Sequence, residues 1–228
     1  VEPAPDFPST GHLYLGACLS VTETAILRVT LQDDSVSEAT EIIAFEEPAA
    51  EEAWHQVGTL RFDTDGALFF GMGEMTVDTH AQDSSDALGA LVRIVPTDDG
   101  YEPAASNPFG DALAIGLRSP WTSVQDSDGN YWVSDVGTGE FEEVNVVEGA
   151  AANFGWPTYE GPGHDADFVD PVVAWDRSTS NPYGNDDAAV LPSTNSVGWV
   201  AAVTADPSID DPYDGAFDEG VLFGDMCF

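Results

Sequence analysis

The sequence contains no lysine, and its basic side chains other than four histidines are five arginines, against 42 aspartates and glutamates. The resulting net charge of −37 repels nucleic-acid backbones and anionic membrane surfaces. We therefore expect no nucleic-acid partner. Any electrostatic partner should be cationic, and calcium is the ion whose chemistry suits oxygen ligands.

The same shortage of positive charge points to a protein adapted to high salt. At molar ionic strength the screening length falls to about 3 Å, which suppresses the repulsion among carboxylates. At low salt that repulsion strains the compact state. The alternative is an acidic secreted protein whose surface charge opposes aggregation. The expected location is secreted or periplasmic.

Long apolar runs and a cysteine framework are also missing. No stretch of about 18 apolar residues occurs, so we expect no membrane insertion. The first residues have neither the basic nor the apolar region of a signal peptide. The two cysteines, Cys18 and Cys227, define neither a disulfide framework nor a metal-ligand spacing. A hydrophobic content of 43% in 228 residues is nevertheless enough for one or two buried cores.

Short alternating apolar runs bounded by glycine, aspartate and proline recur along the chain, and no long segment keeps a helical apolar period. A glycine followed by an apolar or aromatic run occurs four times, at Gly11, Gly66, Gly129 and Gly220. Two of these copies follow an Asp-x-Asp-Gly turn, which is typical of a hairpin. The first two spacings are each close to one four-stranded propeller blade, and the third holds a blade with an inserted loop or two compressed blades.

The repeats predict an all-β propeller of four-stranded antiparallel blades over residues 1–228. About four to five blades are expected, too few to close a six-bladed ring. The sequence ends inside an apparent strand, Leu222–Phe228, which indicates a fragment. An unclosed propeller would expose strand edges.

Three stretches, taken in their order and spacing, resemble the glucose/sorbosone dehydrogenase family. The first comprises Trp54–Phe62 and Asp65–Glu74, similar to the family's His-x-x-Gly-x-Leu-x-Phe, Asp-Gly-x-Leu-Tyr and Gly-Asp patterns. The second runs from Ala81 to Trp121 and includes Ile115-Gly-Leu-Arg-Ser-Pro-Trp121. The third comprises Asp135–Gly137, Glu142–Asn145 and Asn153–Glu160. Its Asp-Val-Gly version resembles the hedgehog-interacting-protein-like branch more than the bacterial sugar dehydrogenases.

The resemblance implies a six-bladed propeller with pyrroloquinoline quinone (PQQ) lying over the central channel and a calcium ion polarising it. The implied reaction is oxidation of an aldose by hydride transfer from the sugar C1 to the quinone, with a histidine base taking the hydroxyl proton. The expected partner is thus a small sugar, and nothing in the sequence indicates which molecule accepts the electrons.

The resemblance also assigns candidate catalytic residues. His55 matches the family's catalytic histidine, and Glu74 stands where the family has the aspartate that orients it. A general base needs a proton-accepting nitrogen near pH 7 and a partner that fixes its tautomer. The alternative for His55 is a structural histidine at a strand start. Arg118 is expected beside the quinone oxygens, where a guanidinium would stabilise developing negative charge; its alternative is a surface ion pair.

Further residues are expected around the cofactor. Ser119 replaces the asparagine usual after that arginine. Trp156 either lines the cofactor floor or fills a blade core, and the core is favoured. The carbonyls of Gly137 and Thr138 are expected to hold calcium, with a plain turn as the alternative.

The remaining histidines, His12, His80 and His164, are expected to be surface residues. Two other functions stay open. One is a non-catalytic propeller that binds a protein or glycan, favoured by Ser119 and the Asp-Val-Gly loop. The other is a calcium-dependent lactonase, which would need a central metal held by side chains. The pair of His55 and Arg118 favours the quinoprotein sugar dehydrogenase.

Overall fold

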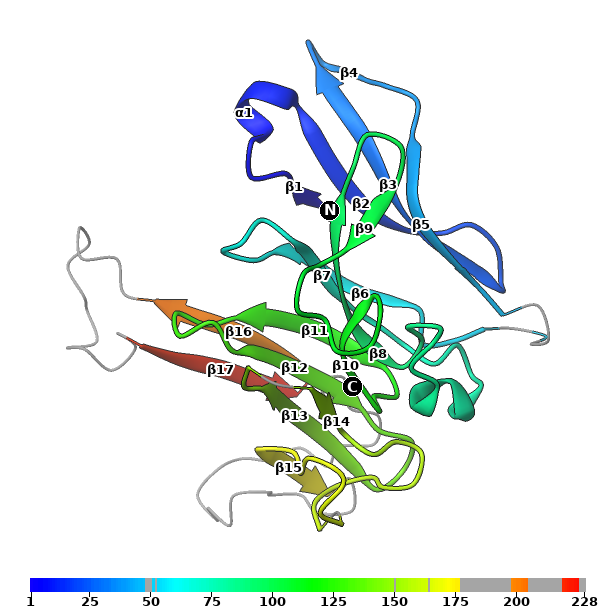
Figure 1. The fold of residues 1–228 in the computed structure, drawn as a ribbon, viewed down its shortest axis with the longest axis vertical. Coiled ribbons are helices and arrows are strands. Elements are labelled where there is room, and N and C mark those ends of the chain that lie inside the picture. Colours follow the sequence, from blue (N-terminus) through cyan, green and yellow to red (C-terminus); the bar gives the residue numbers. More distant parts are fainter. Residues whose placement is uncertain are drawn as a thin grey trace.

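The computed structural model describes residues 1–47, 51, 53–149, 151–163, 165–176, 198–204 and 219–225. Within these residues nearly all regular structure is strand, in four separate sheets (Figure 1). The helical elements are one α-turn, α1 (Phe7–Thr10), and one 3₁₀ segment, η1 (Asp78–Gln82). The all-β prediction is confirmed.

The first sheet is built on a long antiparallel hairpin. Its strands are β1 (Glu2–Pro3), β2 (His12–Cys18), β3 (Glu23–Gln32), β4 (Ser35–Val36) and β5 (Thr40–Glu46). Strand β3 pairs with both β2 and β5, so it forms the centre of the sheet.

The second sheet follows along the chain. Its strands are β6 (Val57–Phe62), β7 (Leu68–Met72), β8 (Ala90–Pro96), β9 (Tyr101–Pro103), β10 (Ala112–Ile115) and β14 (Ala152–Asn153). The first five pair antiparallel to their neighbours, whereas β14 returns from later in the chain and pairs parallel with β10. This return places Asn153–Trp156 beside the second sheet.

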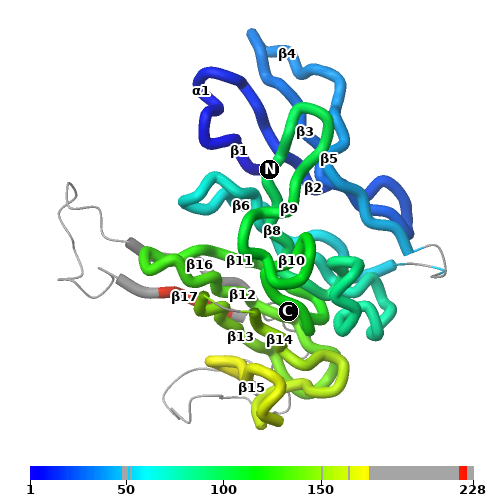
Figure 2. Tube along the Cα trace, viewed as in Figure 1, coloured from blue at the N-terminus to red at the C-terminus, as the bar shows by residue number. Residues whose placement is uncertain are grey.

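The third sheet consists of β11 (Pro120–Gln125), β12 (Tyr131–Val136), β13 (Phe141–Val147) and β15 (Val173–Asp176), all antiparallel. The fourth pairs β16 (Gly198–Thr204) with β17 (Glu219–Asp225). The strands β2, β6, β11 and β16 contact one another in that order. Figure 2 shows the trace passing from the first sheet to the second and third, with β14 lying after β13 in the chain but paired in the second sheet.

Two of the repeated glycine turns have the same geometry. In each, the first aspartate accepts two backbone N–H groups through Oδ1: Asp63 from Asp65 and Ala67, and Asp126 from Asp128 and Asn130. The glycines that follow have φ values of 84° and 89°, a left-handed conformation that L-residues with a side chain rarely adopt. The predicted hairpin turns are confirmed, and they connect β6 to β7 and β11 to β12.

The sheets pack face to face through alternate residues of β7. Phe70 lies in a core with the first sheet, where its ring centroid is 6.2 Å from that of Phe45. Phe69 lies in a second core with the third sheet, where its centroid is 5.0 Å from that of Tyr131. Because successive side chains of a strand point to opposite faces, β7 joins both cores. No helix among the described residues is long and apolar enough to cross a membrane.

Candidate functional site

His55 and Glu74 form a hydrogen-bonded pair beside the second sheet. His55 lies in the loop before β6, with a φ of 55°, and Glu74 follows β7. The Nδ1 atom of His55 is 2.7 Å from Oε1 and 2.9 Å from Oε2 of Glu74. The Glu74 side chain is 1% exposed and that of His55 is 21% exposed. Because carboxylate oxygens only accept, Nδ1 carries the proton, and Nε2 is the nitrogen able to take another.

The backbone after β7 connects this pair to Arg118. The Glu74 N–H donates to the Arg118 carbonyl at 3.1 Å. Asp135, at the end of β12, accepts the N–H groups of Arg118 and Ser119 at 2.8 Å and 2.6 Å. Burial, reinforced by the Glu143 carboxylate, raises the pKa of Asp135 well above its ordinary value, against the effect of these hydrogen bonds. The carboxyl group thus fixes the main chain on which Arg118 and Ser119 sit.

The Arg118 guanidinium lies between two backbone carbonyls and an aromatic ring. Its Nη1 donates to the carbonyls of Val136 and Gly137 at 3.0 Å and 2.7 Å. Its Cζ is 5.6 Å from the ring centroid of Trp156, within cation–π range. None of the ion pairs in the described part of the chain includes Arg118. The structure therefore does not show the surface ion pair considered as its alternative.

Glu160 organises the loop that begins at Gly137. Its Oε1 accepts the N–H groups of four consecutive residues, Thr138 to Phe141, at 2.9–3.1 Å. Burial tends to raise the pKa of Glu160, but these four donors outweigh it and lower that pKa. A Cβ on Gly137 would lie 1.8 Å from the Phe141 carbonyl oxygen, so no larger residue fits. Glu160 ends one of the family motifs in the sequence, but no local pattern predicts that it organises this loop.

Trp156 is held by a side-chain pair that sequence reasoning left without a role. Gln82 Nε2 donates to the Trp156 carbonyl at 2.6 Å and to Asn153 Oδ1 at 3.0 Å. Asn153 Nδ2 in turn donates to Gln82 Oε1 at 2.8 Å. Trp156 is buried, as the core interpretation expects, and also lies against Arg118. Its Nε1 is buried without a hydrogen-bond partner among the described residues.

All predicted site residues therefore lie together. Hydrogen bonds link His55 to Glu74, Glu74 to Arg118, and Arg118 to Gly137. Ser119 and Thr138 are the next residues along the chain from Arg118 and Gly137. Trp156 stacks on the Arg118 guanidinium. The family resemblance assigns His55, Arg118 and Gly137 to one cofactor site, and the structure brings these three residues together. The catalytic and cofactor roles assigned to these residues stay predictions.

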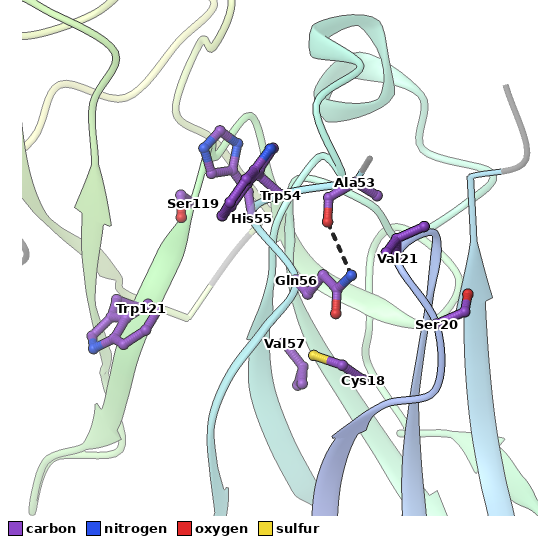
Figure 3. A pocket seen from close by; sticks show the side chains of 10 residues that line it. All are labelled: Cys18, Ser20, Val21, Ala53, Trp54, His55, Gln56, Val57, Ser119 and Trp121. Carbon is purple, nitrogen blue, oxygen red and sulfur yellow. Dashed lines mark hydrogen bonds between the residues drawn. The ribbon is translucent and has the colours of Figure 1, made fainter. Parts of the chain in front are cut away.

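A cavity of about 480 Å³ opens beside His55 (Figure 3). Its lining comes from the end of β2, the loop before β6, and the start of β11: Cys18, Ser20, Val21, Ala53, Trp54, His55, Gln56, Val57, Ser119 and Trp121. Cys18 is an exposed free thiol, whereas Cys227 lies outside the described residues. His55 and Ser119 thus belong to both the hydrogen-bonded site and the cavity.

His80, expected to be a surface residue without partners, is half-buried and paired on both ring nitrogens. Its Nε2 lies 2.6 Å from Glu47 Oε2 and its Nδ1 hydrogen-bonds Asp86 Oδ2, so the ring is held between two acids. Burial lowers the pKa of His80, but the hydrogen bonds to Glu47 and Asp86 raise it more, so its pKa is above the ordinary value. His12 lies on β2, and His164 lies outside the described residues.

The family profile for Glucose / Sorbosone dehydrogenase matches residues 1–186 of the chain. The chain belongs to that family. Among curated proteins it is similar to the HIPL2 protein of Arabidopsis thaliana, at 29% identity in an alignment of 163 residues that covers 54% of this chain and 23% of that protein. The family resemblance read from the motifs is confirmed, including its leaning toward the hedgehog-interacting-protein-like branch.

Solved structures of this family share the fold. The PQQ-bound aldose sugar dehydrogenase of Streptomyces coelicolor matches with a TM-score of 0.67 and 24% identity, covering 77% of this chain and 52% of that one. The apo form of the soluble aldose sugar dehydrogenase of Escherichia coli matches with a TM-score of 0.70 and 20% identity, covering 97% and 64%. The described sheets are therefore blades of an incomplete β-propeller, as predicted.

Proposed function

We propose that the protein oxidises the C1 hydroxyl of an aldose with PQQ and calcium, by hydride transfer to the quinone. The observation that carries this proposal is the continuous hydrogen-bonded path from the His55–Glu74 pair through the Arg118 backbone to the Gly137 carbonyl. It joins a candidate base to a candidate cofactor platform. Membership of a sugar dehydrogenase family and the fold of a PQQ-bound relative support the same assignment.

The residues present supply donors for the cofactor. The carbonyls of Val136 and Gly137 accept hydrogen bonds from Arg118 Nη1, so calcium at this loop would compete with the guanidinium for the Gly137 oxygen, and its placement here rests on the family resemblance. The quinone and carboxylate oxygens of PQQ accept hydrogen bonds, and Arg118 and the unpartnered Trp156 Nε1 are donors. Gly137 and Thr138 would hold calcium through their carbonyls, and Arg118, Ser119 and Trp156 would contact PQQ.

PQQ bound with calcium would supply the two-electron acceptor for the hydride that leaves C1. The protein's own part begins at His55. Nδ1–H donates to Glu74, so Nε2 accepts the proton of the C1 hydroxyl as the C1–O bond gains double-bond character. The buried Glu74 carboxylate then stabilises the imidazolium that forms. The product of a cyclic aldose is its lactone. The two electrons leave with the hydride to the quinone, and the hydroxyl proton goes to His55.

A non-catalytic propeller that binds a protein or glycan is the second candidate. The similarity to HIPL2 favours it, as does Ser119 in place of the usual asparagine. The chain spans about a quarter of HIPL2 and about half of the Streptomyces enzyme, so the activity proposed belongs to the full-length protein.

Reconstitution of the full-length protein with PQQ and calcium chloride tests the proposal. PQQ binding is followed by absorbance titration, and turnover by aldose-dependent reduction of an artificial dye. Binding followed by turnover is the expected result, and a sample treated with a calcium chelator serves as the control. A protein that binds no PQQ would rule out the dehydrogenase, whereas PQQ binding without turnover of any aldose would favour the binding protein.

A further inference from the structure

The exposed aromatic side chains of the described residues gather at one place. Trp54 is 60% exposed and Trp121 is 50% exposed, while the other exposed large hydrophobic residues in the described part of the chain are aliphatic. Both tryptophans line the cavity that also contains His55 and Ser119. Burying a large apolar side chain normally stabilises a fold by about 1.5–3 kcal/mol. In the described part of the chain, two indoles thus line the candidate active site beside the base, where a bound ligand would meet them.

The backbone around Trp121 directs its side chain toward this cavity. The pairing of β11 with β12 shifts register between Pro120 and Thr122, which leaves Trp121 at a β-bulge. Bulges re-aim side chains and occur frequently next to active sites. The bulge is tightly supported, because a Cβ on Gly58 of β6 would lie 2.5 Å from the Trp121 carbonyl oxygen. The position of the indole is thus set by packed main chain, not by a loose loop.

Trp54 is placed next to the candidate base itself. It immediately precedes His55, and its N–H donates to Thr76 Oγ1 at 2.8 Å, which ties this loop to the segment after Glu74. Figure 3 shows Trp54 beside His55, with Trp121 projecting from β11 near Ser119. The two indoles therefore flank the groups that would bind the ring being oxidised.

We propose that Trp54 and Trp121 are stacking platforms for sugar rings beyond the one oxidised, so that the preferred substrate is the reducing end of a neutral oligosaccharide. This rests on the proposed function. A pyranose has a face of C–H groups that packs on an indole, while its hydroxyls stay at the rim. The cavity, at about 480 Å³, lies within the range of ligand sites, about 300–1,000 Å³.

The charge of the molecule selects among sugars. The cavity lining contains no arginine, and the chain carries a net charge of −37, so acidic sugars such as uronic acids are repelled. A neutral chain of hexoses meets no such penalty. The tryptophans act on the affinity for the added rings, whereas His55 acts on the ring being oxidised.

Substrate preference in the full-length protein, loaded with PQQ and calcium, tests this inference. Dye reduction is measured with glucose, maltotetraose and cellotetraose for the wild type and for Trp54→Ala and Trp121→Ala. For at least one tetrasaccharide, we expect the kcat/KM ratio over glucose to fall about two- to tenfold in each variant, as loss of one aromatic stacking contact predicts. Trp132→Phe, on β12 outside the cavity, is the matched control and should keep the wild-type ratio.

A ratio unchanged for both tetrasaccharides would overturn the inference, as would equal losses on glucose and the tetrasaccharides. Calorimetric titration of the protein with the same sugars, without PQQ, measures sugar binding independently of oxidation. It therefore distinguishes a missing stacking site from a missing dehydrogenase activity. If no sugar is oxidised but tetrasaccharide binding is present and is lost in the tryptophan variants, the stacking site stands and the dehydrogenase does not. If neither tetrasaccharide is oxidised or bound, the stacking site is rejected.

Discussion

Single carboxylates hold the main chain at three points of the candidate site. Asp135 accepts two N–H groups next to Arg118, Glu160 accepts four in the loop after Gly137, and Glu143 accepts the N–H of Gly161 at 2.6 Å. Glu160, whose pKa is lowered by its four donors, is the one that most clearly acts as an ionised carboxylate, and an ionised acceptor makes stronger hydrogen bonds than a neutral one. An acidic chain can thus shape its loops with side chains it has in excess.

Replacing Glu160 should loosen the loop that presents the Gly137 carbonyl. Glu160→Ala removes the acceptor of four N–H groups, and because water reaches part of this loop, we expect a loss of about 1–3 kcal/mol in the free energy of unfolding. Urea denaturation measures it. Glu140→Gln, an exposed acid in the same loop, is the control. Equal stability of Glu160→Ala and the control would show that the four contacts contribute nothing.

Replacing the candidate base should separate chemistry from cofactor binding. His55→Ala should lower aldose oxidation by about 10²- to 10⁴-fold, the usual cost of losing a general base. PQQ binding should persist, because the donors proposed for it lie on Arg118 and Trp156. Glu74→Gln should give an intermediate loss, because an amide fixes the imidazole tautomer less well. Steady-state dye reduction and PQQ absorbance titration are the measurements. Full activity of His55→Ala would remove His55 from the mechanism while leaving the cofactor assignment intact.

At the scale of elements, η1 is joined to the first sheet by His80. Its ring bridges Glu47, just beyond β5, and Asp86, in the turn before β8. The neighbouring acid Asp83 also faces this histidine, and its own N–H donates to the His80 carbonyl at 2.8 Å. Glu47 is buried, so deprotonation of His80 would remove the positive charge that lies against this carboxylate. The contact depends on a proton.

This dependence has a definite sign. The pKa of His80 is raised on folding, so the folded state holds the proton more tightly than the unfolded state. The stabilisation is fully present below the unfolded pKa of about 6.5 and is lost as pH rises through the higher folded pKa. The difference in Tm between wild type and His80→Gln should therefore be largest near pH 5.5 to 6 and shrink toward about pH 9. Thermal melts across this range measure it, with His12→Gln as the control. A difference that grows with pH would contradict the bridge.

The elements differ in how far the sequence could predict them. The hairpin turns at Asp63 and Asp126 are local, since the backbone N–H groups that each aspartate accepts through Oδ1 lie within four residues, and the sequence pattern predicts them directly. The link between His80 and Glu47 spans 33 residues, and that between Glu160 and Thr138 spans 22, so neither has a local signature. The family motifs predicted where His55, Arg118 and Gly137 meet, because motif order carries the long-range information that periodicity lacks.

At the scale of the whole molecule, the few cations are already engaged. Arg93 pairs with Asp63 and Asp65, Arg61 pairs with Glu2, and Arg28 donates to the carbonyls of Thr97 and Asp98. Arg177 lies outside the described residues. Most of the 42 acids therefore have no arginine to offset their charge. Their mutual repulsion destabilises the folded state more than the unfolded state, because the carboxylates are closest together when the chain is folded.

Added salt should therefore stabilise the protein. Between 0.01 M and 1 M ionic strength the screening length shrinks from about 30 Å to about 3 Å, so repulsion between exposed carboxylates is largely removed. We expect the thermal midpoint to rise steadily across a sodium chloride series, because a net charge of −37 has more repulsion to lose in the compact state than in the expanded one. Sucrose, which is uncharged and stabilises folded proteins by exclusion from their surface, is the control. If the effect comes from charge screening, sodium chloride should raise the thermal midpoint at concentrations at which sucrose does not yet raise it. A flat or falling midpoint would leave the acidic secreted protein as the explanation of the composition, since such a surface opposes aggregation without requiring salt to fold.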